Sequence, residues 1–184
     1  STQEPLDLKQ FIYELDVPVI VGGAAGYTPA LHLMRTGAAG VLVGFGGGAS
    51  TTTRRAMGIR VPMATAISDI AEARRDYMDE SGGRYVHVIA DGALGRSGDI
   101  AKAIACGADA AVLGTPLAAA ASAPGRGYYW SAAAAHPSMP RGALLAVAED
   151  EGRPDLQTVL HGPTDDPFGH LNIVGALRRS MAKA

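Results

Sequence analysis

Cysteine, aromatic side chains, net charge and long apolar runs are all scarce in this chain of 184 residues. Cys106 is the single cysteine, so an internal disulfide framework and a cysteine-rich metal site are both excluded. Aromatic residues make up 5% of the sequence and the formal net charge is −2, which disfavours a nucleic-acid partner. No apolar run approaches the roughly 20 residues of a membrane span, and charged residues interrupt the N-terminal stretch, which argues against a signal peptide. We therefore expect a cytoplasmic protein that binds neither nucleic acid nor membrane.

Short apolar runs alternate with amphipathic segments along most of the chain, whose length fits one domain. The runs predict strands over Val17–Gly23, Gly40–Phe45, Tyr85–Ala90 and Ala110–Gly114. The amphipathic spacing predicts helices over Pro5–Leu15, Thr28–Gly37, Ala64–Glu80 and Leu171–Ala182, and a further helix from Ser97. Thr28 and Ser97 are the residue types that favour the N-cap position of a helix. Residues 116–170 lack sustained periodicity and are predicted to be a loop-rich insertion.

The chain contains an internal repeat. Gly37–Gly44 (GAAGVLVG) is similar to Gly107–Gly114 (GADAAVLG), with a period of about 70 residues that holds two strand–helix units. Such a repeat predicts a parallel sheet with right-handed crossovers, in which ligands bind at the carboxyl ends of the strands. The candidate binding groups all follow predicted strands, at Gly22–Gly23, Gly46–Thr53, Asp91–Gly92 and Gly114–Thr115.

The stretch Tyr85–Asp99 (YVHVIADGALGRSGD) carries the sharpest local pattern. A carboxylate, Asp91, ends the apolar run, and three glycines precede or begin the next helix. Glycines let backbone N–H groups crowd around an anion, so one turn offers both a ribose-binding carboxylate and a phosphate cradle. A plain strand–loop–helix junction is the alternative, because a lone glycine-rich loop is a weak signal.

Three segments resemble the IMP dehydrogenase/GMP reductase family. GFGGGASTTTR resembles the family's active-site loop G-x-G-x-x-C-x-T-R, and ADGALGRSGDIAKAIACGADAAVLGTPLA resembles its ADGG-x-x-x-SGD…GA-x-x-V-x-x-GS stretch. YMDESGGRYVHVIADG and GALRRSMA are most similar to its actinobacterial branch, which lacks the regulatory CBS module. The resemblance implies a TIM (β/α)8 barrel, of which residues 1–184 would form a single partial domain holding about the C-terminal four βα units. We therefore expect the chain to be part of a longer or processed protein.

The resemblance also assigns roles to individual residues. Asp91 would bind the ribose hydroxyls, while Gly92, Ala93, Gly114, Thr115 and, with weaker support, Tyr128 would surround the phosphate. Ala93 departs from the family's second glycine, and Ala49 stands where the family has a phosphate-side serine. Gly46, Gly48 and the carbonyl of Thr51 would form a loop for a monovalent cation such as K+, and no other metal site is expected. The five histidines lack metal-ligand spacing.

The reactive position is where the family pattern fails. The family's nucleophilic cysteine attacks C2 of the purine, and its position is occupied by Thr51. A threonine hydroxyl without an adjacent base is not expected to replace a thiolate. Thr53, which matches the threonine that activates water or ammonia, is kept, and Cys106 is expected to be a buried structural thiol.

Three functions follow from these observations. The first is an oxidoreductase that uses NAD or NADP and acts on the purine monophosphates IMP or GMP, as a homo-oligomer that is a tetramer by the family's habit; its activity is in doubt because of Thr51. The second is a catalytically silent nucleotide-binding subunit. The third is an FMN-binding barrel oxidoreductase, because similar strand–glycine patterns occur in such barrels.

Overall fold

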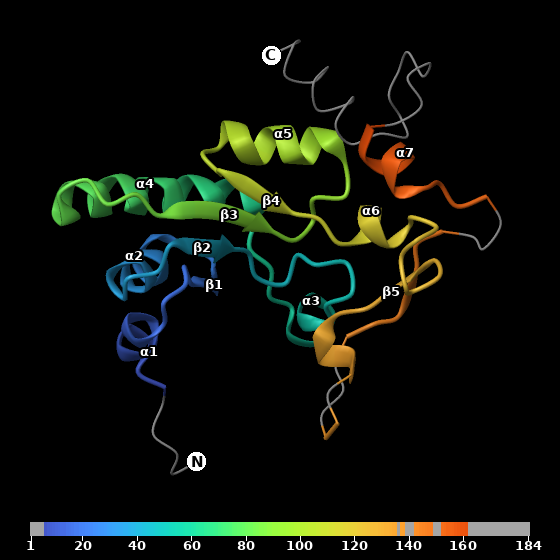
Figure 1. Ribbon diagram of the computed structural model, residues 1–184, viewed down its shortest axis with the longest axis horizontal. Coiled ribbons are helices and arrows are strands. Elements are labelled where there is room, and N and C mark those ends of the chain that lie inside the picture. Colours follow the sequence, from blue (N-terminus) through green and yellow to red (C-terminus); the bar gives the residue numbers. More distant parts are fainter. Residues whose placement is uncertain (1–5, 136, 139–141, 149–151, 162–184) are drawn as a thin grey trace.

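The computed structural model describes residues 6–135, 137–138, 142–148 and 152–161. Its centre is a four-stranded sheet in the order β1-β2-β3-β4 (Figure 1). The strands are β1 (Ile20–Ala24), β2 (Gly40–Val43), β3 (His87–Asp91) and β4 (Ala110–Val112), and every neighbouring pair is parallel. The four strands and their parallel pairing confirm the sequence prediction, and all their carboxyl ends lie at one edge.

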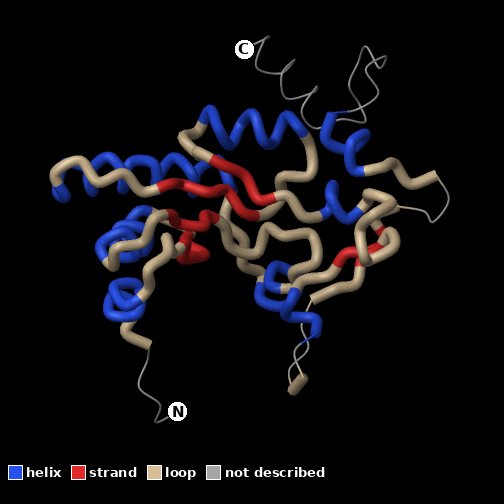
Figure 2. The backbone as a smooth tube through the Cα atoms, in the orientation of Figure 1, coloured by secondary structure: helices blue, strands red, loops and turns tan. Residues whose placement is uncertain are grey.

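Helices and strands alternate along the first part of the chain, as Figure 2 shows. They are α1 (Leu8–Glu14), α2 (Tyr27–Arg35), α3 (Thr53–Met57), α4 (Met63–Ser81) and α5 (Ser97–Ala105). The helix α3 begins at Thr53, within the stretch 46–55 where a loop was expected. The predicted helix Leu171–Ala182 lies outside the described residues.

The two faces of the sheet differ in their burial. Val41, Val43, Val88 and Ala90 are fully buried and belong to one apolar core with Met34, Ile67 and Ile70 of the covering helices. On the other face Ile20, His87, Asp91 and Val112 are exposed in the described part of the chain. A parallel sheet is normally covered on both faces. This chain therefore presents a half-covered sheet.

Two predicted helix caps are wrong. α2 begins at Tyr27 with Gly26 at the N-cap, so Thr28 is the second helical residue. α5 begins at Ser97 with Arg96 at the N-cap. Gly26 has no side chain to cap α2, and the Arg96 side chain makes no capping hydrogen bond to α5. Boundaries are weakly specified when more than one residue near a helix start is able to adopt the extended N-cap conformation.

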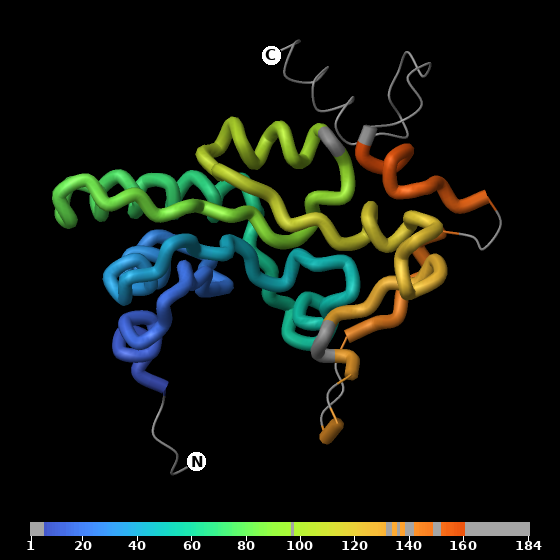
Figure 3. Tube along the Cα trace, viewed as in Figure 1, coloured from blue at the N-terminus to red at the C-terminus, as the bar shows by residue number. Residues whose placement is uncertain are grey.

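Short elements follow β4. They are α6 (Thr115–Ala118), β5 (Tyr128–Tyr129), the 3-10 helix η1 (Ala132–Ala135), β6 (Leu145–Ala146) and α7 (Leu156–His161), and β5 pairs with β6 antiparallel. The β5–β6 region lies beside the loop after β2, because the Ala143 N–H donates to the Ser50 carbonyl at 2.7 Å (Figure 3). Ser50 is the buried polar residue of the described part, 3% exposed, so this contact fixes the loop that precedes α3.

An ion-pair cluster fastens the amino ends of β3 and β4. The carboxylate of Asp109 accepts hydrogen bonds from Arg74 at 2.6 Å, the Tyr85 hydroxyl at 2.5 Å and the Val88 N–H at 2.8 Å. Burial would raise the pKa of Asp109, but these hydrogen bonds and the charge of Arg74 outweigh it and hold the pKa below its ordinary value. The cluster therefore stabilises the end of the sheet opposite the carboxyl ends.

Within the described residues no helix is both long and apolar enough to cross a membrane.

Candidate functional site

The loops that follow β2, β3 and β4 meet around one pocket of about 220 Å³. Each loop leaves the carboxyl end of its strand, which is the edge where ligands bind parallel sheets. The lining residues are Gly47, Gly48, Ala49, Asp91, Gly92, Ala93, Leu94, Gly95, Val112, Gly114, Thr115 and Tyr129. Five of the predicted substrate-site residues, far apart in sequence, are therefore brought together: Asp91, Gly92, Ala93, Gly114 and Thr115.

Glycines allow the first two loops to touch. A Cβ built on Gly44 would overlap the carbonyl oxygen of Asp91, and one built on Gly92 would lie 3.1 Å from the backbone nitrogen of Gly48. Gly92 has a φ of +108°, which side-chain-bearing residues rarely adopt. The close approach leaves the backbones of Gly47 and Gly48 against Gly92, so the pocket floor is largely backbone.

Asp91 supplies the carboxylate of the pocket. It is the last residue of β3, and its backbone is held in register opposite Val112 of β4. The side chain is exposed, and no hydrogen bond or ion pair joins it to another described residue. A carboxylate that the fold does not use internally is available to accept hydrogen bonds from a ligand.

Ala93 takes a left-handed conformation, with a φ of +59°. This conformation costs a residue with a Cβ roughly 1–2 kcal/mol, whereas glycine adopts it freely. The departure from glycine at this position therefore strains the turn, while the Ala93 N–H still lies on the pocket wall.

Tyr129, rather than Tyr128, lies in this pocket. A Cβ built on Gly114 would stand 2.5 Å from the Tyr129 hydroxyl, so the phenol packs directly over Gly114. Tyr128 is 49% exposed and lines an adjoining apolar pocket of about 490 Å³ with Trp130, and Gly114 and Tyr129 line this pocket as well. Of these two pockets, Tyr129 lines both, whereas Tyr128 lines the apolar one alone. The sequence pointed to the Tyr128–Tyr129 pair but did not predict which of the two rings lines the smaller pocket.

Thr51 lies in a neighbouring pocket. Its hydroxyl is 3.0 Å from the hydroxyl of Thr53, which is the first residue of α3. This second pocket, of about 400 Å³, is lined by Gly46, Gly47, Gly48, Ala49, Thr51, Arg54, Arg55 and Arg60. The two pockets share Gly47, Gly48 and Ala49, so they lie on either side of one loop. No carboxylate or imidazole of a described residue lines the Thr51 pocket to deprotonate the hydroxyl.

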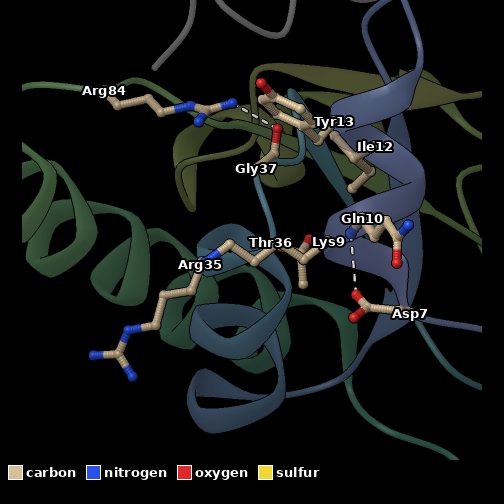
Figure 4. A pocket seen from close by; sticks show the side chains of 9 residues that line it. All are labelled: Asp7, Lys9, Gln10, Ile12, Tyr13, Arg35, Thr36, Gly37 and Arg84. Atoms are coloured by element: carbon tan, nitrogen blue, oxygen red, sulfur yellow. Dashed lines mark hydrogen bonds between the residues drawn. The ribbon is translucent and has the colours of Figure 1, made fainter.

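A larger pocket, of about 560 Å³, lies away from these loops between α1 and the end of α2 (Figure 4). Several of its polar side chains already have partners in the fold. Asp7 accepts from the Gln10 N–H at the start of α1, and Arg84 donates to the Gly37 carbonyl at 2.5 Å. Arg35 is paired with Glu80 at 2.6 Å. This pocket contains none of the predicted site residues, and we assign it no binding role.

Among the described residues, Cys106 and the histidines are not gathered into a further site. Cys106 is partly buried at the C-cap of α5 and has no disulfide partner. Across residues 6–135 and the shorter described ranges after them, no three His, Cys, Asp or Glu side chains are grouped for a metal ion.

The chain is similar to known proteins over most of its length. The model of the IMP dehydrogenase / GMP reductase domain matches residues 6–157. An uncharacterized oxidoreductase of Mycolicibacterium smegmatis is 68% identical over 185 residues, which cover 100% of this chain and 49% of that protein. An inosine-5′-monophosphate dehydrogenase of Thermoplasma acidophilum is 44% identical over 119 residues, which cover 65% of this chain and 23% of that protein.

A solved structure gives the same result. The crystal structure of an IMP dehydrogenase/GMP reductase-like protein from Corynebacterium glutamicum superposes with a TM-score of 0.84 at 57% identity, and the match covers 96% of this chain and 46% of that one. The chain thus spans about half the length of the relatives it matches most fully.

Proposed function

This chain belongs to the IMP dehydrogenase / GMP reductase domain family, and from that membership we propose that the protein binds a purine nucleoside 5′-monophosphate. The observation that carries the proposal is the convergence of Asp91 and Gly92 from one loop and Gly114 and Thr115 from another on one pocket, which the glycine loop after β2 completes. Asp91 would accept hydrogen bonds from the ribose hydroxyls. Backbone N–H groups of Gly92 and Ala93 and the Thr115 hydroxyl would hold the phosphate. Tyr129, which lines this pocket and packs against Gly114, would join them, whereas Tyr128 lines the adjoining apolar pocket.

In our proposal the four βα units are the C-terminal half of a TIM (β/α)8 barrel. The exposed face of the sheet, with Ile20, His87 and Val112, would then be the barrel interior, which the rest of the protein would close. Residues 116–170 would be an insertion in that barrel, carrying Tyr128 and Tyr129. The whole protein would assemble as a homo-oligomer, as the tetrameric family habit implies.

The proposed reaction is NAD- or NADP-dependent oxidoreduction at C2 of the purine. The family's covalent step needs a thiolate, and Thr51 at that position has the Thr53 hydroxyl as its neighbour and no base among the described residues that line its pocket. The Thr51 N–H donates to the Gly48 carbonyl at 3.2 Å, so the two residues lie within one turn. Two ligands of one K+ ion would have to lie this close together. Thr53 would position the water or ammonia of the second half-reaction.

The identity of Thr51 favours a second candidate function, that of a nucleotide-binding subunit without catalysis. The two candidates are separated by following the absorbance of reduced nicotinamide when the intact protein is mixed with IMP or GMP and NAD(P). Turnover by the wild type would support the oxidoreductase, whereas nucleotide binding without turnover would support the silent subunit. In either case Thr51→Cys should raise turnover, because a thiolate is then available. Thr52→Cys, one residue along the same loop, is the matched control and should turn over no faster than the wild type. Equal rates for the wild type and Thr51→Cys would contradict the assignment of Thr51 to the nucleophile position.

A further inference from the structure

A run of positive charge accompanies the loop after β2. Between Phe45 and Ser68 the chain has three arginines, Arg54, Arg55 and Arg60, and no acidic residue, although the net charge of the whole chain is −2. All three side chains are exposed. No hydrogen bond or ion pair joins them to side chains in the part of the chain that the structure describes. The fold itself therefore does not use these guanidinium groups.

The three arginines line one pocket rather than a dispersed surface. They come from two segments, α3 and the stretch before α4, and they face Gly46, Gly47, Gly48, Ala49 and Thr51 across about 400 Å³. Among the described residues, the lining has three cations and no anion. An anion that enters the pocket would therefore be attracted by all three charges and would offset their mutual repulsion.

Two glycines of this loop are not required by the fold. Gly46 needs to be glycine, because its φ is +70° and a Cβ there would lie 2.7 Å from the Ile59 carbonyl. Gly47 and Gly48 lack such constraints, since the nearest atom to an added Cβ would be 3.8 Å away in each case. A side chain would fit at both positions, so their glycines keep the backbone bare where the two pockets adjoin. Bare backbone allows a ligand to approach closely.

We propose that Arg54, Arg55 and Arg60, together with the backbone at Gly47 and Gly48, form a diphosphate-binding site next to the nucleotide pocket. Guanidinium groups suit this chemistry because their planar N–H donors match phosphate oxygens in pairs. The site shares a loop with the proposed monophosphate site and contains Thr51. A diphosphate held here would belong either to the nicotinamide dinucleotide or to a separate effector nucleotide. The inference rests on the proposed function only for the first of these sources.

The test is calorimetric titration of the intact protein with inorganic pyrophosphate, at low and at high salt, for the wild type, Arg55→Gln and Arg60→Gln. We expect each substitution to weaken pyrophosphate binding about tenfold, and salt to weaken it in the wild type. Arg75→Gln is the matched control, because Arg75 is exposed on α4 and lines none of the described pockets. IMP affinity should be unchanged in all three variants, which shows that each one folds.

The outcomes separate the sources of the diphosphate and also separate this proposal from the proposed function. Competition between pyrophosphate and NAD(P) would assign the site to the dinucleotide, whereas displacement by a nucleoside triphosphate but not by NAD(P) would assign it to an effector. Pyrophosphate binding that is absent, or that is equal in the wild type and both loop variants, would overturn the proposal. A protein that binds pyrophosphate through these arginines but binds neither IMP nor GMP would keep this site and refute the proposed function.

Discussion

Replacement of Asp91 by asparagine is the sharpest perturbation of the nucleotide pocket. The carboxylate is exposed, has no partner among the described residues and sits at the end of β3, where only its backbone takes part in the sheet. Asp91→Asn should therefore leave folding unchanged, unlike most substitutions at a strand end. Any loss of affinity then reports on contact with the ligand.

The size of the loss follows from the hydrogen bonds. An ionised carboxylate has two oxygens and accepts from both ribose hydroxyls, and hydrogen bonds to a charged group contribute about 1.5–3 kcal/mol each. Asparagine keeps a single acceptor oxygen and no charge. We expect Asp91→Asn to cost about 2–3 kcal/mol, which corresponds to a loss of roughly 30- to 150-fold in affinity.

The assay is calorimetric titration of the intact protein with IMP and with its 2′-deoxy analogue. The wild type should bind the deoxy nucleotide more weakly, and Asp91→Asn should lose less affinity for it than for IMP, because one of the two hydroxyl donors is already missing. Asp99→Asn is the control: Asp99 lies on α5, pairs with Lys102 at 2.8 Å and lies outside the pocket. Equal losses for the two nucleotides in Asp91→Asn would refute the ribose contact, and so would undiminished IMP affinity.

Two further predictions concern stability. Ala93→Gly should raise Tm by about 2 °C, because the strain that it relieves at φ +59° exceeds the stability lost through the greater entropy of glycine in the unfolded chain. A Tm at or below that of the wild type would contradict this prediction. Asp109→Asn should cost about 2 kcal/mol at neutral pH, because Arg74, Tyr85 and Val88 lose their anionic acceptor. The pKa of Asp109 is lowered in the folded state, so its contribution is complete above the unfolded pKa of about 3.9 and is lost as the pH falls through the folded value. Denaturant titrations should therefore show the gap between the two proteins narrowing in acid, and a gap independent of pH would contradict this account.

The strands could be read from the sequence because a parallel sheet with a buried face needs continuous apolar runs. Val41, Val88 and their neighbours provide them. The helix starts could not be placed as well. Thr28 and Ser97 both carry side chains that suit the N-cap position, but α2 begins at Tyr27 and α5 begins at Ser97, so each of the two residues lies inside its helix. Chemistry at one residue does not fix where a helix starts when packing positions the helix as a whole.

The site was predictable in part for a related reason. Asp91, Gly92 and Thr115 follow strands, and parallel strands bring their carboxyl ends together whatever lies between them. Whether Tyr128 or Tyr129 lines the pocket depends on the orientation of a two-residue strand in a loop-rich region, and so short a strand has no hydrophobic periodicity from which to predict that orientation. The grouping of Arg60 with Arg54 and Arg55 required the turn after α3 to fold back on the glycine loop.

The most direct test of the account is calorimetric titration of the intact wild-type protein with IMP and GMP, compared with the nucleoside inosine. The pocket combines a ribose carboxylate with a phosphate cradle, so the account predicts saturable binding of a purine monophosphate and at least about tenfold weaker binding of the nucleoside. Equal affinity for nucleotide and nucleoside, or no binding of either monophosphate, would contradict the claim that these loops form a purine nucleotide site.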